Sequence, residues 1–152
     1  MHPPEFWSGA GAGARVLRAA LAPASWIYGN SVARKAARAA PFRARAKVVC
    51  VGNLTVGGTG KTPVAIAIAK LLAARGLRAA LLTRGYGGRA KGPLILDRAR
   101  DLASEVGDEP LMAASSAPVI VARDRRKGAE LADAQGMDVI VMDDGHQNFS
   151  LA

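Results

Sequence analysis

The sequence predicts an α/β domain with a mostly parallel sheet and helices on both faces, preceded by a separate N-terminal helical segment. Short runs such as "KVVCV", "APVIVA" and "DVIVM" are continuously apolar, which is typical of strands buried on both faces. These runs alternate with segments of helical pattern, and this rhythm predicts parallel strands joined by crossover helices. Residues 1–46 differ in composition from residues 47–152, so we expect an N-terminal segment followed by one α/β domain.

The charge balance favours an anionic partner. Lys and Arg number 21 against 12 Asp and Glu, a formal net charge of +9. Nucleic acid, an anionic membrane surface and a phosphorylated ligand all fit this balance, and so does a surface of merely solvated arginines. The single cysteine, Cys50, excludes an internal disulfide.

The N-terminal segment, 1–46, is basic and has one acidic residue, Glu5. We expect two helical pieces, 14–22 and 26–40, broken near Pro23. Both tryptophans lie here with arginines nearby, a composition that fits a helix in a membrane headgroup layer. An ordinary helical hairpin packed on the following domain is the equally favoured alternative.

The start of the chain predicts neither a cleaved signal peptide nor a membrane-spanning helix. "MHPPEFWSG" lacks a basic start followed by an apolar core. The longest uncharged stretch, 19–33, has 15 residues and contains a proline. A span needs about 20 apolar residues.

The α/β domain is predicted to begin with a strand at 47–53. A helix at 62–75 follows and ends at Gly76, a common C-terminal stop. The later elements are expected as strands at 78–83, 92–97, 117–122 and 137–144, and as helices at 106–116 and 124–135.

A glycine-rich loop, "VGNLTVGGTGKTP", lies between the first strand and the first helix of this domain. The phosphate-binding pattern G-x-x-x-x-G-K-[ST] would place glycine where the chain has Thr55. The glycines allow successive backbone N–H groups to face phosphate oxygens, Lys61 can reach the β- and γ-phosphates, and the Thr62 hydroxyl can ligate Mg²⁺. With the strand before it and the helix after it, the loop predicts a P-loop NTPase-like fold over a chance glycine-rich turn. The predicted nucleotide-binding residues are Thr55, Val56, Gly57, Gly58, Thr59, Gly60, Lys61 and Thr62.

Acidic residues follow or precede two other elements. The last strand ends in Asp143 and Asp144, which are placed to bind Mg²⁺ opposite Thr62. In "GDEP", Asp108 and Glu109 lie at a helix start, at the sheet end where ligands collect. Asp108 can act as a base toward an acceptor hydroxyl or help to hold metal, although the residues alone favour a helix N-cap. His146 and Gln147 follow the aspartate pair, and their roles stay open.

In this order, the motifs "FWSG", "SWIYG", "VGNLTVGGTGKTP", "RGYGG", "GDEP", "VARDRRKGA" and "DDGHQN" resemble the tetraacyldisaccharide 4′-kinase family, the lipid A 4′-kinases. The resemblance runs from about Phe6 to Asn148, and threonine in place of the first loop glycine is characteristic of that family. It implies an ATP-dependent transferase that moves the γ-phosphate to the 4′-hydroxyl of a tetraacylated glucosamine disaccharide 1-phosphate in lipid A biosynthesis.

The resemblance also implies roles for single residues. Lys61 and Thr62 serve phosphate and Mg²⁺, Asp143, Asp144 and Glu109 belong to the metal site, and Asp108 is the acid/base residue. The implied cofactors are ATP and Mg²⁺. The implied partners are the anionic lipid disaccharide and a membrane surface, with no nucleic acid, at the cytoplasmic face of the bacterial inner membrane.

Members of that family are longer and carry a second α/β lobe with further catalytic residues. We therefore expect this chain to be an N-terminal fragment or a truncated product. Two alternatives remain: another kind of P-loop ATPase, and a nucleotide-binding module without turnover because it lacks the closing lobe.

Overall fold

The computed structural model describes residues 11–52, 60–145 and 148–152. Contacts divide the chain into two compact units at Ala40, with the α/β unit beginning at Pro41. The segment before the first strand belongs to this second unit, because Ala46 is buried and Phe42 packs beside the core.

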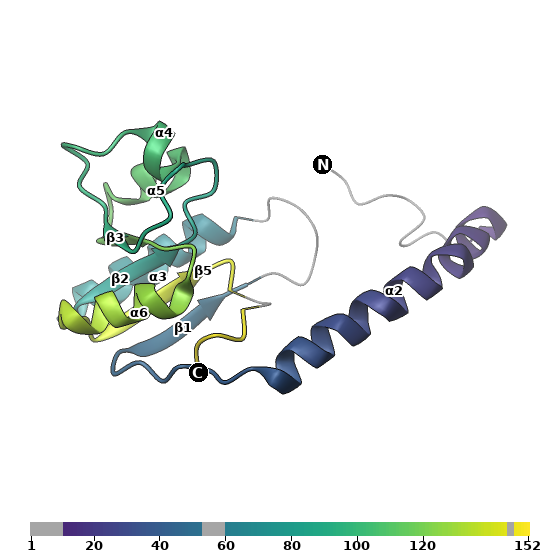
Figure 1. The fold of residues 1–152 in the computed structure, drawn as a ribbon. Coiled ribbons are helices and arrows are strands. Elements are labelled where there is room, and N and C mark those ends of the chain that lie inside the picture. The colour runs from purple at the N-terminus through teal and green to yellow at the C-terminus, as the bar shows by residue number, and fades with distance from the viewer. Residues whose placement is uncertain (1–10, 53–59, 146–147) are drawn as a thin grey trace. The chain divides into compact units, whose positions relative to one another are not determined.

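The N-terminal unit contains one long helix, α2 (Ala12–Arg38), drawn in purple and blue in Figure 1. The prediction of two pieces broken near Pro23 is wrong, since Pro23 lies inside the helix. An interior proline removes one backbone hydrogen bond and costs about 3 kcal/mol. The residues on either side are rich in alanine, the strongest helix former, and the helix continues through the proline.

The α/β unit contains five strands and four helices among its described residues. In chain order they are β1 (Lys47–Val51), α3 (Lys61–Ala74), β2 (Ala79–Thr83), β3 (Leu94–Ile95), α4 (Ala103–Val106), α5 (Asp108–Ala113), β4 (Val119–Val121), α6 (Arg125–Ala134) and β5 (Val139–Asp143). The predicted elements are confirmed with small shifts at their ends. The four-residue helix α4 was not predicted, because one turn is too short to show a periodic pattern.

The strands form a single sheet in the order β1-β5-β2-β4-β3. All neighbours are parallel except the short edge strand β3, which runs antiparallel to β4. The predicted mostly parallel α/β sheet is confirmed. The register pairs Val51 with Asp143 and Thr83 with Val121, so the carboxyl ends of these strands lie at one edge of the sheet.

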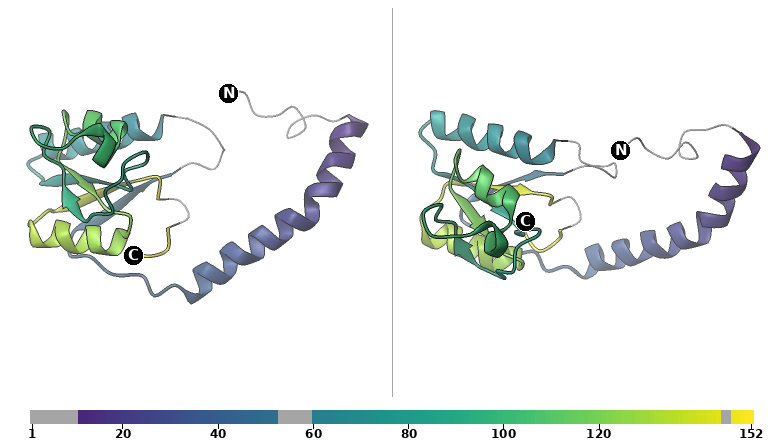
Figure 2. Two further views of the ribbon diagram at one scale, coloured as in Figure 1. Left: turned by 45° about the horizontal axis from the view of Figure 1, so that its top comes forward. Right: turned by 90° about the horizontal axis from the view of Figure 1, so that it is seen from above.

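Helices cover both faces of the sheet, as predicted. Successive strand residues point to opposite faces. Leu81 and Val141 pack in one cluster with α3, α4 and α5, whereas Leu82 and Ile140 pack in the other with α6. Figure 2 shows α3 and α6 on opposite sides of the sheet. The sheet is thus a rigid base, and the elements that carry the predicted site begin or end at its carboxyl edge.

Candidate nucleotide-binding site

Thr62 and Asp143 meet at the carboxyl edge of the sheet. Thr62 lies in the first turn of α3, and Asp143 is the last residue of β5. The Thr62 hydroxyl donates a hydrogen bond to Asp143 Oδ2 at 2.9 Å. The two residues are 81 positions apart in sequence. They come together because β1, which leads toward α3, pairs with β5.

Lys61 and Asp144 form a second pair beside the first. The distance from Lys61 Nζ to Asp144 Oδ1 is 3.3 Å, and the aspartate side chain is 70% exposed. An ion pair this exposed contributes little to stability, about 0–1 kcal/mol. Lys61 can therefore exchange this carboxylate for a phosphate group at small cost.

The two adjacent aspartates differ in environment. Asp143 is buried, and its Oδ1 has no hydrogen-bond partner among the described residues. Asp144 is exposed and adopts a positive φ of 54°. This difference follows from the strand end: Asp143 still faces α3, and the chain turns outward at Asp144.

A small cavity adjoins the Thr62–Asp143 pair. Its volume is about 10 Å³, roughly the space needed for one water molecule or ion. The polar residues that line it are Thr62, Thr83, Glu109 and Asp143. A hydroxyl, carboxylates and one unpartnered carboxylate oxygen suit Mg²⁺, which prefers oxygen ligands. No group of three or more acidic, histidine or cysteine side chains in the described part of the chain could hold a metal alone. A magnesium ion here would therefore also need phosphate or water oxygens.

The two acidic residues of "GDEP" lie in different surroundings. Both Asp108 and Glu109 lie in the first turn of α5. Glu109 lines the cavity with Thr62 and Asp143, whereas Asp108 is exposed and does not line it. The N-cap of α5 is Gly107, so Asp108 is not the N-cap residue that the sequence alone favours.

Gly107 joins the "GDEP" turn to the "RGYGG" loop. Its φ of 94° and ψ of 152° lie in a region that essentially only glycine adopts. A Cβ at this position would collide with the carbonyl oxygen of Tyr86. Beside these loops, the Ala90 N–H donates a hydrogen bond to Glu105 O at 2.8 Å. The close packing of these two segments fixes the backbone at Gly107 and therefore the position of Asp108, the next residue.

We expect Gly107→Ala to lower the free energy of unfolding by about 2–4 kcal/mol, because backbone strain adds to a backbone collision. Gly76→Ala is the matched control, since Gly76 has a φ of 79° but open space around it. The control should cost only about 1–2 kcal/mol for the left-handed backbone. Urea unfolding measures both, and equal losses would contradict the proposed close packing.

Part of the predicted site lies outside the described residues. This applies to Thr55, Val56, Gly57, Gly58 and Thr59 of the predicted phosphate loop, and to His146 and Gln147. Gly60, Lys61 and Thr62 are described, with Gly60 as the N-cap of α3.

Arg125 is a site residue that the sequence reasoning missed. It is 2% exposed, and its Nη2 donates to the main-chain oxygen of Asp143 at 2.9 Å. Burial, together with the nearby Arg84 charge, lowers the pKa of Arg125 to about 10, so it stays protonated at neutral pH. A signal was available, because the buried residues of α6 follow helical spacing from this position: Arg125, Gly128, Ala129 and Ala132.

Comparisons with known proteins show the family of the chain. A family profile described as tetraacyldisaccharide-1-P 4′-kinase matches residues 17–152. The chain belongs to this family. A tetraacyldisaccharide 4′-kinase from Maricaulis maris is 53% identical over 156 residues and aligns with 100% of this chain. A kinase of the same name from Methylorubrum extorquens is 54% identical over 99% of this chain.

A solved structure is also similar: the LpxK protein from Aquifex aeolicus, described as an "apo" form in complex with ATP. The TM-score is 0.72 at 33% identity, over 90% of this chain and 46% of that one. The chain likewise covers 46% of the Maricaulis maris kinase and 45% of the Methylorubrum extorquens kinase. It therefore spans about half the length of the tetraacyldisaccharide 4′-kinase family members that it matches.

Proposed function

We propose that this chain binds ATP and forms the nucleotide-binding part of a kinase that phosphorylates the 4′-hydroxyl of a tetraacylated glucosamine disaccharide 1-phosphate. The observation that carries the proposal is the Thr62–Asp143 hydrogen bond of 2.9 Å beside the Lys61–Asp144 pair. A hydroxyl, a lysine and a carboxylate at the junction of a strand end and a helix start are the groups that phosphoryl transfer requires. Family membership supports the choice of acceptor.

In this proposal Lys61 leaves Asp144 and binds the β- and γ-phosphates. The first turn of α3 offers unpaired backbone N–H groups and the positive end of its dipole to the same anion. Residues 55–60 would complete the cradle through their backbone, as the glycine-rich sequence predicts. All these groups bind and orient the phosphates, which is most of what catalysis of phosphoryl transfer needs.

Mg²⁺ would be held by the Thr62 hydroxyl and the Asp143 carboxylate, with Glu109 beside the same cavity and Asp144 next in the chain. The unpartnered Asp143 Oδ1 supports this assignment, because a buried carboxylate oxygen without a partner is costly unless a ligand satisfies it. When bound, the ion neutralises negative charge on the phosphate oxygens.

We expect Asp143→Asn to remove most of the enhancement of ATP binding by Mg²⁺. The amide keeps the shape and can still accept from Thr62, but it loses the charge that attracts the cation. Isothermal titration with ATP, with and without Mg²⁺, measures the effect. Asp138→Asn is the control at the opposite end of β5, where Asp138 accepts from Arg78 N–H. An unchanged magnesium dependence in Asp143→Asn would exclude Asp143 as a metal ligand.

The acceptor hydroxyl is proposed to approach Asp108. Its carboxylate is exposed at the start of α5, next to Glu109 and outside the metal cavity. An exposed carboxylate that is not taken up by the metal is free to accept a proton from the attacking 4′-hydroxyl.

We also propose that α2 contacts an anionic membrane surface, which would place the protein peripherally at the cytoplasmic face of the inner membrane. No residue of α2 is buried, and Trp26, Ile27 and Tyr28 are exposed. Lys35 and Arg38 lie in its last turn, and the helix has no acidic residue. The described residues contain no helix of the length and apolarity that crossing a bilayer demands. Basic residues and interfacial aromatics favour adsorption on anionic headgroups.

Two proteins test the proposed function: the 152-residue chain, and a chimera that continues it with the remaining residues of the Maricaulis maris relative. Both should bind ATP, and the chimera should transfer labelled γ-phosphate to the lipid disaccharide. If both proteins bind ATP but only the chimera phosphorylates the lipid, the 152-residue chain has a nucleotide-binding role without turnover of its own. ATP hydrolysis that ignores the lipid would instead favour another P-loop ATPase and contradict the proposal.

A further inference from the structure

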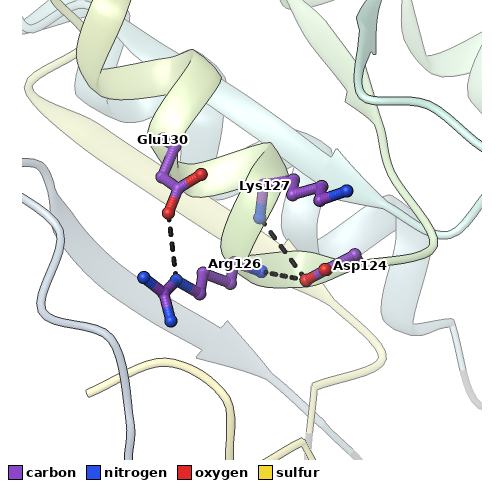
Figure 3. A network of polar contacts seen from close by, with 4 residues as sticks. All are labelled: Asp124, Arg126, Lys127 and Glu130. Carbon is purple, nitrogen blue, oxygen red and sulfur yellow. Dashed lines mark hydrogen bonds and ion pairs between the residues drawn. The ribbon is translucent and has the colours of Figure 1, made fainter.

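Arg125 is the first residue of α6 and is buried next to Asp143 of the proposed nucleotide site. The helix start is fixed by Asp124, whose carboxylate accepts from Arg126 N–H at 3.0 Å and Lys127 N–H at 3.4 Å (Figure 3). Arg126, the next residue, faces outward: it pairs with Glu130 at 3.0 Å and lies over the Phe42 ring. Two adjacent arginines thus have opposite surroundings, one buried and one exposed.

The surroundings of Arg125 do not favour it as a stabilising residue. Its charge is buried at the positive end of a helix dipole, where a cation is disfavoured. Among the described residues, no ion pair involves Arg125, and its Nε has no hydrogen-bond partner. A buried charge with incomplete pairing is often replaced by an apolar residue without loss of stability. Stability therefore does not explain an arginine at this position.

Arg125 makes two hydrogen bonds to main-chain oxygens of described residues. Its Nη1 donates to Ala122 O at 3.5 Å, and the shorter bond is at the centre of the proposed site. Its Nη2 holds the main-chain oxygen of Asp143 at 2.9 Å, on the peptide that joins the two aspartates. On one side of this peptide the Asp143 carboxylate binds Thr62, and on the other the Asp144 carboxylate binds Lys61. Asp144 has a φ of 54°, which side chains other than glycine rarely adopt. The hydrogen bond from Arg125 to this carbonyl therefore holds the turn and both carboxylates in place.

We propose that Arg125 is a positioning residue for magnesium binding: through its hydrogen bond to the Asp143 carbonyl it fixes the Asp143–Asp144 peptide and so holds both carboxylates where a magnesium ion can meet them. This inference rests on the proposed function. Because Arg125 is buried, it acts on the ion only through these aspartates.

The test measures ATP binding by the 152-residue chain over a series of Mg²⁺ concentrations. Arg125→Met keeps the length of the side chain and removes the buried charge, so the fold should survive. We expect the Mg²⁺ concentration for half-maximal enhancement to rise about 10- to 100-fold, the usual effect of losing a group that orients a metal ligand. ATP binding without Mg²⁺ should change much less, because Lys61 remains. Arg125→Lys should recover part of the loss.

Arg126→Met is the matched control, with the same change of charge one residue away, and it should keep the wild-type magnesium dependence. Circular dichroism and thermal unfolding establish that each variant is folded. A folded Arg125→Met with wild-type magnesium dependence would overturn the inference while leaving the proposed function intact. If both Arg125 variants unfold, the residue is structural and the inference is equally wrong. If the wild-type chain binds no ATP, the proposed function itself fails.

Discussion

Lys61→Ala is expected to weaken ATP binding by this chain about 10- to 100-fold, because hydrogen bonds to a charged group contribute about 1.5–3 kcal/mol. Lys61 starts α3, and its ammonium group is held toward the carboxyl edge of the sheet by Asp144 at 3.3 Å. Since that ion pair is exposed, its loss should leave the melting temperature nearly unchanged. Isothermal titration with Mg-ATP measures the affinity.

Lys70→Ala is the control for this prediction. Lys70 lies on the same helix, is exposed, and is removed from the sheet edge where the nucleotide is expected. Its substitution changes the net charge equally, so a nonspecific effect of charge would appear in both variants. Equal affinity of Lys61→Ala and wild-type chain for ATP would refute the proposed phosphate site.

Asp108→Asn is expected to lower the turnover number for lipid phosphorylation about 10²- to 10⁴-fold, the usual contribution of a general base. The substitution keeps the shape of an exposed side chain, so stability and ATP affinity should stay close to wild type. The chimera with the Maricaulis maris relative is the protein to use, because this chain spans 46% of that kinase. Transfer of labelled phosphate to the disaccharide gives the rate.

Glu105→Gln provides the comparison for Asp108. Glu105 is an exposed acid on α4, three positions before Asp108, and it lies outside the proposed site. Loss of turnover should be confined to Asp108→Asn. If the asparagine variant retained the wild-type rate, proton removal from the acceptor would have to be assigned elsewhere.

Local sequence features predicted most of the elements correctly. Continuously apolar runs identified β1, β4 and β5. The burial on both faces that such runs predict is found in β4 and β5, but that prediction is wrong for β1, an edge strand in which Val49 and Cys50 are exposed. Gly76 marked the end of α3, and it adopts a left-handed φ of 79°. Pro23 misled the prediction for α2, because a cost of about 3 kcal/mol in one turn is smaller than the helix propensity of the long flanks.

Some residues of the candidate site could also be predicted from the sequence. A glycine-rich loop between a strand and a helix, with an acidic pair after a later strand, indicates phosphate and magnesium binding through short-range patterns. The sequence could not distinguish Asp143 from Asp144, because adjacent residues share every local property. Their difference in burial and partners arises where β5 ends against α3.

By itself, then, the sequence determined the α/β class, the approximate positions of its elements and the family resemblance, and it predicted part of the candidate site. Only the tertiary structure decided the strand order, the Thr62–Asp143 contact, the separation of Glu109 from Asp108, and the buried contact of Arg125 with the Asp143 carbonyl. The physical reason is distance along the chain. Periodicity and capping act over one or two turns, whereas the strand order, the two contacts and the cavity that Glu109 lines depend on residues far apart in sequence that meet only when the parallel strands pair.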